Sequence, residues 1–140
     1  MSRLDPLMTA LFDFNRTYQE LWDKYGFDSA PDYVATCATV RIDPGRLSGK
    51  SNWIAAHTKV GEAIAIIPPI MVENPLHQAI YQGVANTFTL DDVRAGKCRD
   101  LAYRHVYVDD ASLQLNCPQA ERELIDALVT DHDQLVVLIG

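Results

Sequence analysis

One stretch of the sequence decides which fold is expected: Asp43-Pro44-Gly45-Arg46-Leu47-Ser48-Gly49-Lys50-Ser51. It follows a run rich in β-branched residues, 34–42, and precedes a run of helical character, 52–57. A strand, a tight loop ending in Gly-Lys-Ser and a helix together are typical of a phosphate-binding site. The backbone N–H groups of such a loop point inward, and the helix N-terminus adds partial positive charge. Lys50 then supplies a full charge, and Ser51 supplies a hydroxyl group for a magnesium ion.

Length and composition indicate a single domain over residues 1–140. The 140-residue chain is 48% hydrophobic and 22% charged, which is ordinary for a folded globular protein. Its net charge of −7 argues against a protein that binds nucleic acid on its own through a basic face. The three cysteines form no Cys-x-x-Cys motif, and no apolar run is long enough to span a membrane. We therefore expect a cytoplasmic protein without membrane contact.

The first 26 residues predict a helix. Apolar residues recur at three- and four-residue steps from Leu4 to Tyr25, as they do on one face of an amphipathic helix. Asp5 is expected at the N-cap, Pro6 in the first turn and Gly26 at the C-terminal cap. We expect residues 1–26 to pack on the sheet as an N-terminal helix.

Four apolar runs predict strands. They cover residues 34–42, 63–67, 104–108 and 134–139. Further helices are expected over residues 51–59, 75–84, 89–95 and 118–129, with a loop at 26–32. Alternating strands and helices favour right-handed crossovers and a parallel sheet with helices on both sides. The expected fold is α/β, a three-layer α/β/α sandwich with a small, mainly parallel sheet of about four strands.

Two motifs resemble those of a known family. Gly45-Arg46-Leu47-Ser48-Gly49-Lys50-Ser51 resembles a Walker A loop, and Val106-Tyr107-Val108-Asp109-Asp110 resembles a Walker B strand. The chain thus resembles a P-loop nucleoside triphosphatase of the branch in which another strand separates the acidic strand from the phosphate-loop strand. It is most similar to the ATPase cores of helicases and viral DNA-packaging terminases, in a minimal, phage-like version. For a viral source, the expected location is the host cytoplasm.

The resemblance implies a role for each motif residue. The nucleotide-binding residues would be Gly45, Arg46, Leu47, Ser48, Gly49, Lys50 and Ser51. Lys50 would bridge the β- and γ-phosphates, and Ser51 with Asp109 would hold Mg²⁺. Asp110 would polarise the attacking water, so that Lys50 and Asp110 are the implied catalytic residues. The implied cofactor is Mg²⁺ with ATP or another nucleoside triphosphate.

Two positions depart from the family pattern. Pro44 stands where the family has the first glycine of its loop, so we expect Gly45 to make the bend. Asp110 stands where many members have glutamate, and an aspartate side chain is one methylene shorter. Arg46 has two interpretations, contact with a γ-phosphate or surface charge.

The expected function is Mg²⁺-dependent binding of a nucleoside triphosphate with slow or partner-dependent hydrolysis. The sequence ends at Gly140, directly after the last predicted strand, whereas the family places a polar sensor, a lid or an arginine finger beyond that strand. An arginine finger supplied in trans accelerates hydrolysis by about 10³- to 10⁵-fold. We therefore expect a protein partner or self-assembly to supply the missing arginine.

Two other functions fit the same motifs. A non-catalytic interaction protein that keeps the fold is compatible with Pro44, Asp110 and the end of the sequence at Gly140. A small nucleotide kinase requires a basic lid, and the basic cluster within residues 94–104 is the one stretch that resembles it. Whether the chain is an enzyme stays open at this point.

Overall fold

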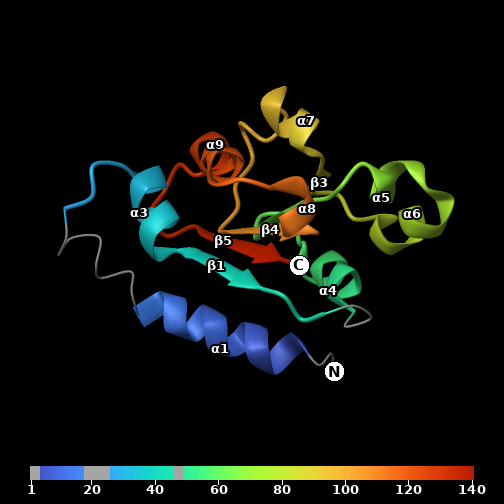
Figure 1. Ribbon diagram of the computed structural model, residues 1–140, viewed down its shortest axis with the longest axis horizontal. Coiled ribbons are helices and arrows are strands. Elements are labelled where there is room, and N and C mark those ends of the chain that lie inside the picture. Colours follow the sequence, from blue (N-terminus) through green and yellow to red (C-terminus); the bar gives the residue numbers. More distant parts are fainter. Residues whose placement is uncertain (1–3, 18–25, 46–48) are drawn as a thin grey trace.

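Five parallel strands form one sheet, and helices lie on both of its faces (Figure 1). The computed structural model describes residues 4–17, 26–45 and 49–140. The strands are β1 (Thr39–Ile42), β2 (Ala63–Ile66), β3 (Thr87–Phe88), β4 (His105–Asp109) and β5 (Leu135–Ile139). Their order in the sheet is β1-β5-β4-β2-β3, and every pairing is parallel. The α/β class and the parallel sheet agree with the sequence analysis.

The position of β5 in the sheet determines how far apart the ends of β1 and β4 lie. β5 pairs with β1 on one side and with β4 on the other, so it separates the strand before the glycine-rich loop from the strand that ends in Asp109. Such a separation was expected from the sequence. The sheet has one strand more than expected, because the two-residue β3 adds to its edge beside β2.

Helices cover both faces of the sheet. Figure 1 shows α1 (Leu4–Thr17) and α4 (Lys50–His57) below it, and α3 (Ala30–Cys37), α7 (Leu90–Arg94), α8 (Ala111–Gln114) and α9 (Pro118–Leu128) above it. Two more helices, α5 (Ile70–Glu73) and α6 (Pro75–Tyr81), extend to one side between β2 and β3. The strands β2 and β5 are buried along their whole length, as expected for apolar runs in a covered parallel sheet.

The segment before the glycine-rich loop is folded differently from the prediction. Residues 34–42 were expected to be one strand, but Val34 lies in the helix α3 and the strand starts only at Thr39. Ser29 caps this helix, because its Oγ accepts a hydrogen bond from Asp32 N at 3.3 Å, and Pro31 stands in the first turn. The cap and the burial of Val34 outweigh the β propensity of the segment, so the predicted loop at 26–32 is also wrong at its end.

The N-terminal helix is attached to the sheet and to α4. α1 begins at Leu4, so Asp5 lies in its first turn rather than at the N-cap. The side chain of Asp5 accepts a hydrogen bond from Trp53 Nε1 of α4 at 2.7 Å. Phe12 of α1 stacks on His105 of β4 with ring centroids 4.7 Å apart. The predicted continuation of this helix over residues 18–25 lies outside the described residues.

The remaining elements match the sequence in part. α7 is capped at Thr89 as expected, and Asp92 completes a capping box with it. α9 starts at Pro118 as expected, while α6 ends at Tyr81, three residues before its predicted end. The short helices α5 and α8 were not predicted, because four residues are too few for an apolar period to show.

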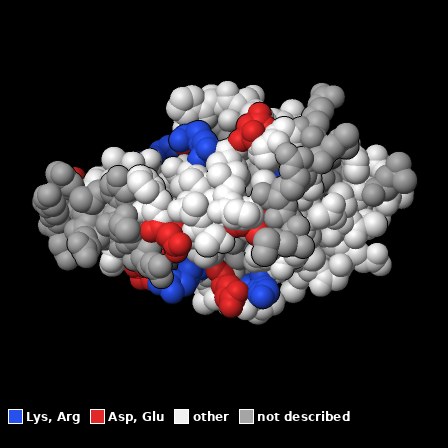
Figure 2. Space-filling model, turned by 90° about the horizontal axis from the view of Figure 1, so that it is seen from below, with Lys and Arg blue, Asp and Glu red and all other residues white. Residues whose placement is uncertain are grey.

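The surface of the described residues shows no gathering of basic side chains on the face drawn in Figure 2, where lysine, arginine and acidic residues are interspersed. Within the described part of the chain, none of the helices has the length and apolar character needed to cross a bilayer.

Candidate functional site

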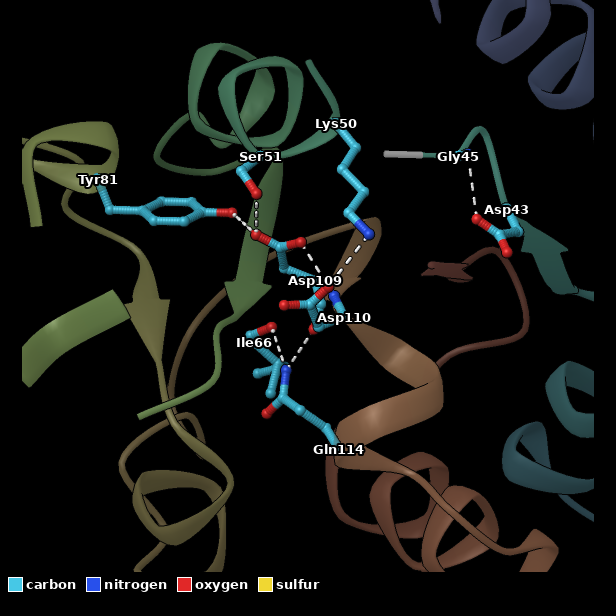
Figure 3. A network of polar contacts seen from close by, with 9 residues as sticks. All are labelled: Asp43, Gly45, Lys50, Ser51, Ile66, Tyr81, Asp109, Asp110 and Gln114. Atoms are coloured by element: carbon cyan, nitrogen blue, oxygen red, sulfur yellow. Dashed lines mark hydrogen bonds and ion pairs between the residues drawn. The ribbon is translucent and has the colours of Figure 1, made fainter. Parts of the chain in front are cut away.

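Polar side chains gather where β1, β4 and β5 end and α4 begins (Figure 3). The carboxyl ends of parallel strands lie at one edge of a sheet, and open α/β sheets bind their ligands at that edge. The fold therefore brings the two sequence motifs, which are far apart in the chain, to one place. The polar contacts among them define the candidate site.

The glycine-rich loop bends at its glycines. Gly45 has a φ of +85° and Gly49 a φ of +80°, which are left-handed conformations that glycine adopts without strain. The backbone N–H of Gly45 donates to Asp43 Oδ1 at 3.1 Å, which fixes the entry to the loop as an Asx turn. Gly45 thus makes the bend at the position after Pro44, as expected. Arg46, Leu47 and Ser48 lie outside the described residues, and their roles stay predictions.

The first turn of the helix α4 borders the site and has no side-chain cap among the described residues. Gly49 is the N-cap of this helix. The first turn contains Lys50 and Ser51 and no acidic residue. The unpaired N–H groups and the partial positive charge of such a turn favour an anion.

Ser51 and Asp109 connect the two motifs. Ser51 Oγ donates a hydrogen bond to Asp109 Oδ2 at 2.7 Å, although the residues are 58 positions apart in the sequence. Asp109 ends β4 and is fully buried, with 0% of its surface exposed. A buried carboxylate is costly unless several donors surround it. Asp109 has them, because its Oδ1 also accepts from the backbone N–H of Asp110 at 2.9 Å.

Tyr81 is a site residue that the sequence did not reveal. Its hydroxyl group donates to the same oxygen of Asp109, Oδ2, at 2.6 Å. Burial, and then the negative charge of Asp109, raise the pKa of Tyr81 far above its usual range, so the hydroxyl stays protonated and remains a donor. In the sequence Tyr81 is one apolar position of a helix, and only the folded structure brings that helix to Asp109.

Lys50 and Asp110 form an ion pair beside this buried group. Lys50 Nζ lies 3.1 Å from Asp110 Oδ1, and the two side chains are 23% and 34% exposed. Asp110 has a φ of +47°, which makes it the one non-glycine residue with positive φ in the described part of the chain. This conformation costs about 1–2 kcal/mol for an ordinary residue. Strain of this kind is often found at functional positions.

Gly140 packs directly against Lys50. A Cβ atom on Gly140 would lie 2.5 Å from Lys50 Nζ, and its φ is +95°. The backbone of Gly140 is fixed on both sides, because its N–H donates to Ile42 O at 2.8 Å and its carbonyl accepts from Ser112 N at 2.7 Å. Only a glycine leaves room for the amino group of Lys50 in its present place.

Gln114 holds two strand ends together below the carboxylates. Its Nε2 donates to the backbone carbonyls of Asp109 at 2.5 Å and of Ile66 at 3.1 Å. A cavity of about 450 Å³ lies next to the site and is lined by Asp43, Ser112, Leu138 and Gly140, among others. The site therefore borders on space that a ligand can occupy.

The oxygen atoms present suit a magnesium ion that is bound together with phosphates. Among the described residues, no three or more His, Cys, Asp or Glu side chains form a cluster that would hold a metal alone. Mg²⁺ needs less than that, because it commonly takes one or two protein oxygens and completes its octahedron with phosphate and water. Ser51 and the buried Asp109 provide two such oxygens beside the first turn of α4.

A comparison of the chain with protein-family models, with curated proteins and with solved structures gave no match.

Proposed function

We propose that the chain binds a nucleoside triphosphate, with ATP as the expected nucleotide, together with Mg²⁺ at the carboxyl edge of its sheet. Hydrolysis is proposed to be slow or to depend on a partner. The observation that carries the proposal is the hydrogen bond from Ser51 Oγ to Asp109 Oδ2 at 2.7 Å. It joins the predicted phosphate loop to the predicted acidic strand.

The contact between the motifs supports the proposal more strongly than either motif does. Gly-Lys-Ser and Asp-Asp are short enough to occur by chance. Two motifs that occur by chance would not be expected to lie in contact in the folded protein. Here the amino group of Lys50 lies 3.1 Å from the carboxylate of Asp110, and the adjacent Ser51 donates a hydrogen bond to Asp109. The placement of β5 between β1 and β4 supports the same family branch that the motifs resemble.

The residues of the site divide the work of holding the phosphates and the metal. Lys50 leaves Asp110 to reach the β- and γ-phosphates, and the first turn of α4 offers its N–H groups to the same anion. Ser51 and Asp109 hold Mg²⁺, which neutralises phosphate charge when it is bound. Asp110 is thereby released from its ion pair and accepts a hydrogen bond from the attacking water.

The described residues also support slow hydrolysis. Lys50 is the one cation among them that pairs with Asp109 or Asp110. Arg41, which stands on the neighbouring β1, pairs with Glu121 instead. An arginine from a partner or a second copy of the chain would therefore accelerate hydrolysis by about 10³- to 10⁵-fold.

The kinase hypothesis loses its main support. Three basic residues of the cluster that resembles a lid pair with aspartates: Arg94 with Asp91, Lys97 with Asp92 and Arg104 with Asp133. These carboxylates pair with three of the four basic residues of the cluster, which also contains Arg99. The non-catalytic alternative gains support from one observation, namely that Lys50 is already engaged by Asp110 and packed against Gly140.

Calorimetric titration with ATP, with and without Mg²⁺, tests the proposed function. We expect the wild type to bind Mg-ATP and Lys50→Ala to lose at least tenfold in affinity, because the variant lacks a charged hydrogen bond to phosphate. Lys59→Ala is the matched control, since Lys59 is an exposed lysine just beyond α4. Phosphate release is measured on the same samples. Equal binding by Lys50→Ala and the wild type would contradict the proposal, and the absence of binding to ATP, GTP and their analogues would favour a non-catalytic interaction protein.

A further inference from the structure

We infer that Tyr81 is the positioning residue that holds Asp109 in its metal-binding orientation, an inference that rests on the proposed function. Figure 3 shows the hydroxyl groups of Tyr81 and Ser51 approaching one carboxylate oxygen of Asp109 from two different helices. Tyr81 ends α6, Ser51 is the second residue of α4, and these two helices pack against each other. The carboxylate of Asp109 thus connects the two helices through hydrogen bonds.

The carboxylate of Asp109 is fixed at both oxygens. Oδ1 accepts from the backbone N–H of Asp110 at 2.9 Å, while Oδ2 accepts from Ser51 at 2.7 Å and from Tyr81 at 2.6 Å. Bonds to both oxygens restrict rotation of the carboxylate about its own axis. The orientation matters because Mg²⁺ demands near-ideal octahedral geometry.

Tyr81 and Ser51 are not equivalent donors. The oxygen of Ser51 is needed as a ligand of the metal, so the geometry of its bond to Asp109 changes between the free and the loaded protein. The phenol of Tyr81 has no such second task. It is 6% exposed and lies on the side of Asp109 formed by α6, where it donates to Oδ2 in the free protein and can continue to donate when the metal is bound. Tyr81 therefore keeps the carboxylate of Asp109 in place while the oxygen of Ser51 changes from a hydrogen-bond donor to Asp109 into a ligand of the metal.

Outer-shell donors of this kind affect metal affinity in other proteins. Their removal typically weakens metal binding by about 10- to 100-fold, although they do not touch the metal. Tyr81→Phe removes the hydroxyl group and keeps the ring that fills the space. We expect it to raise the Mg²⁺ concentration at half-saturation of Mg-dependent ATP binding by about tenfold or more. The affinity for ATP in the absence of Mg²⁺ should stay within about twofold of the wild type, because Tyr81 does not contact the phosphate-binding residue Lys50.

Tyr103→Phe is the matched control. Tyr103 is partly buried and likewise donates a hydrogen bond, at 2.5 Å, but to the backbone carbonyl of Leu128, away from the site. Both variants lose one phenolic hydrogen bond, buried at Tyr81 and partly buried at Tyr103, and thermal unfolding without ligand measures the structural cost of each. Only Tyr81→Phe should shift the Mg²⁺ midpoint.

The outcomes separate this inference from the proposed function. A shifted midpoint in Tyr81→Phe, with an unchanged midpoint in Tyr103→Phe, supports the role of Tyr81. Normal binding by the wild type and an unshifted midpoint in Tyr81→Phe would overturn that role alone. An equal loss of affinity with and without Mg²⁺ would also overturn it, because it would indicate a general structural defect. If the wild type binds no nucleotide at all, both the function and the inference fall.

Discussion

The amino group of Lys50 lies 3.1 Å from the carboxylate of Asp110, so the two implied catalytic residues neutralise each other in the free protein. In the proposed function, nucleotide binding breaks this pair, because Lys50 is proposed to reach the phosphates. The ion pair would then oppose binding by a small amount, and it would keep Asp110 from acting as a base until Lys50 has moved. This relationship gives the first prediction.

Asp110→Asn should separate nucleotide binding from hydrolysis. Asparagine keeps the shape of the side chain and tolerates the left-handed backbone of residue 110. An ion pair as exposed as this one is worth about 1 kcal/mol or less, so Mg-ATP should bind up to about fivefold more tightly. Phosphate release should fall by about 100-fold or more, because the variant lacks the base. Calorimetry and a phosphate-release assay measure the two effects, and parallel loss of binding and turnover would contradict this assignment of roles.

Gly140→Ala should disturb Lys50. The new Cβ atom would stand 2.5 Å from Lys50 Nζ and 3.6 Å from the Cα of Asp110. The amino group of Lys50 must therefore leave this place already in the free protein. Because the proposed nucleotide binding also moves Lys50 away from Asp110, the weakened ion pair should let ATP affinity rise by up to about fivefold. Calorimetric titration with Mg-ATP measures this effect.

Gly61→Ala is the control for the cost of placing alanine in the left-handed backbone conformation of Gly140. Gly61 has a φ of +83°, and a Cβ atom there would meet nothing within 4 Å. Both alanine variants should lose about 1–2 kcal/mol of unfolding free energy from the left-handed conformation. ATP affinity should rise only in Gly140→Ala; an equal change in Gly61→Ala would show that displacement of Lys50 is not the cause.

Arg122→Gln should destabilise the protein in a pH-dependent way. Arg122 of α9 contacts Asp32 of α3 at 2.5 Å and Asp126 at 2.9 Å. The hydrogen bond from Arg122, and then the one from Ser29, hold the pKa of Asp32 below its ordinary value of 3.8. A lowered pKa in the folded state contributes stability above pH 3.8, which is lost as the pH falls through the folded-state pKa.

Urea unfolding at a series of pH values tests this prediction. The difference in unfolding free energy between the wild type and Arg122→Gln should be constant from neutral pH down to the ordinary pKa of Asp32, and should shrink below it. A difference that grows on acidification would have the wrong sign for the ion pair between α3 and α9. Lys59→Ala, which removes an exposed positive charge elsewhere, serves as the control.

Cys117→Ser should stabilise the protein. Cys117 occupies the N-cap of α9 with a φ of −151° and a ψ of 157°, but its side chain makes no capping hydrogen bond. Serine at such a position accepts a bond from the first turn and adds about 0.5–1 kcal/mol. Urea unfolding of Cys117→Ser and Cys117→Ala measures the effect. Because alanine cannot cap a helix, an equal gain in both variants would point to removal of the thiol and not to capping.

The sequence predicted the fold where the signal was local and repeated. The buried runs that became β2, β4 and β5 were recognisable because both faces of these strands are covered. The segment containing Val34 was misassigned, because its β-branched residues were given more weight than the cap formed by Ser29 and Pro31. Such a conflict between propensity and capping is decided by packing, and Val34 is fully buried. Packing of this kind is not visible in the residues of the segment itself.

The candidate site was predictable in its charged residues and not in its supporting ones. Lys50, Ser51, Asp109 and Asp110 belong to motifs of fixed spacing, so their meeting was expected and their contacts agree with it. Tyr81 reaches Asp109 across 28 positions through the packing of α6, and no motif marks it. Gln114 escaped notice for the same reason, since its two acceptors are backbone carbonyls, which have no sequence signature.

The attachment of α4 has a consequence for the entropy of ligand binding. Trp53, one turn after Lys50, donates to Asp5 of α1 at 2.7 Å, stacks on His57 at 4.0 Å and meets the ring of Tyr107 edge-on at 5.3 Å. These contacts fix α4 against α1 and β4. The N–H groups of its first turn are therefore preorganised, and the phosphates of the proposed nucleotide would lose little binding free energy in ordering them. Among the described residues, the ordering cost of the proposed binding would then fall mainly on the side chain of Lys50.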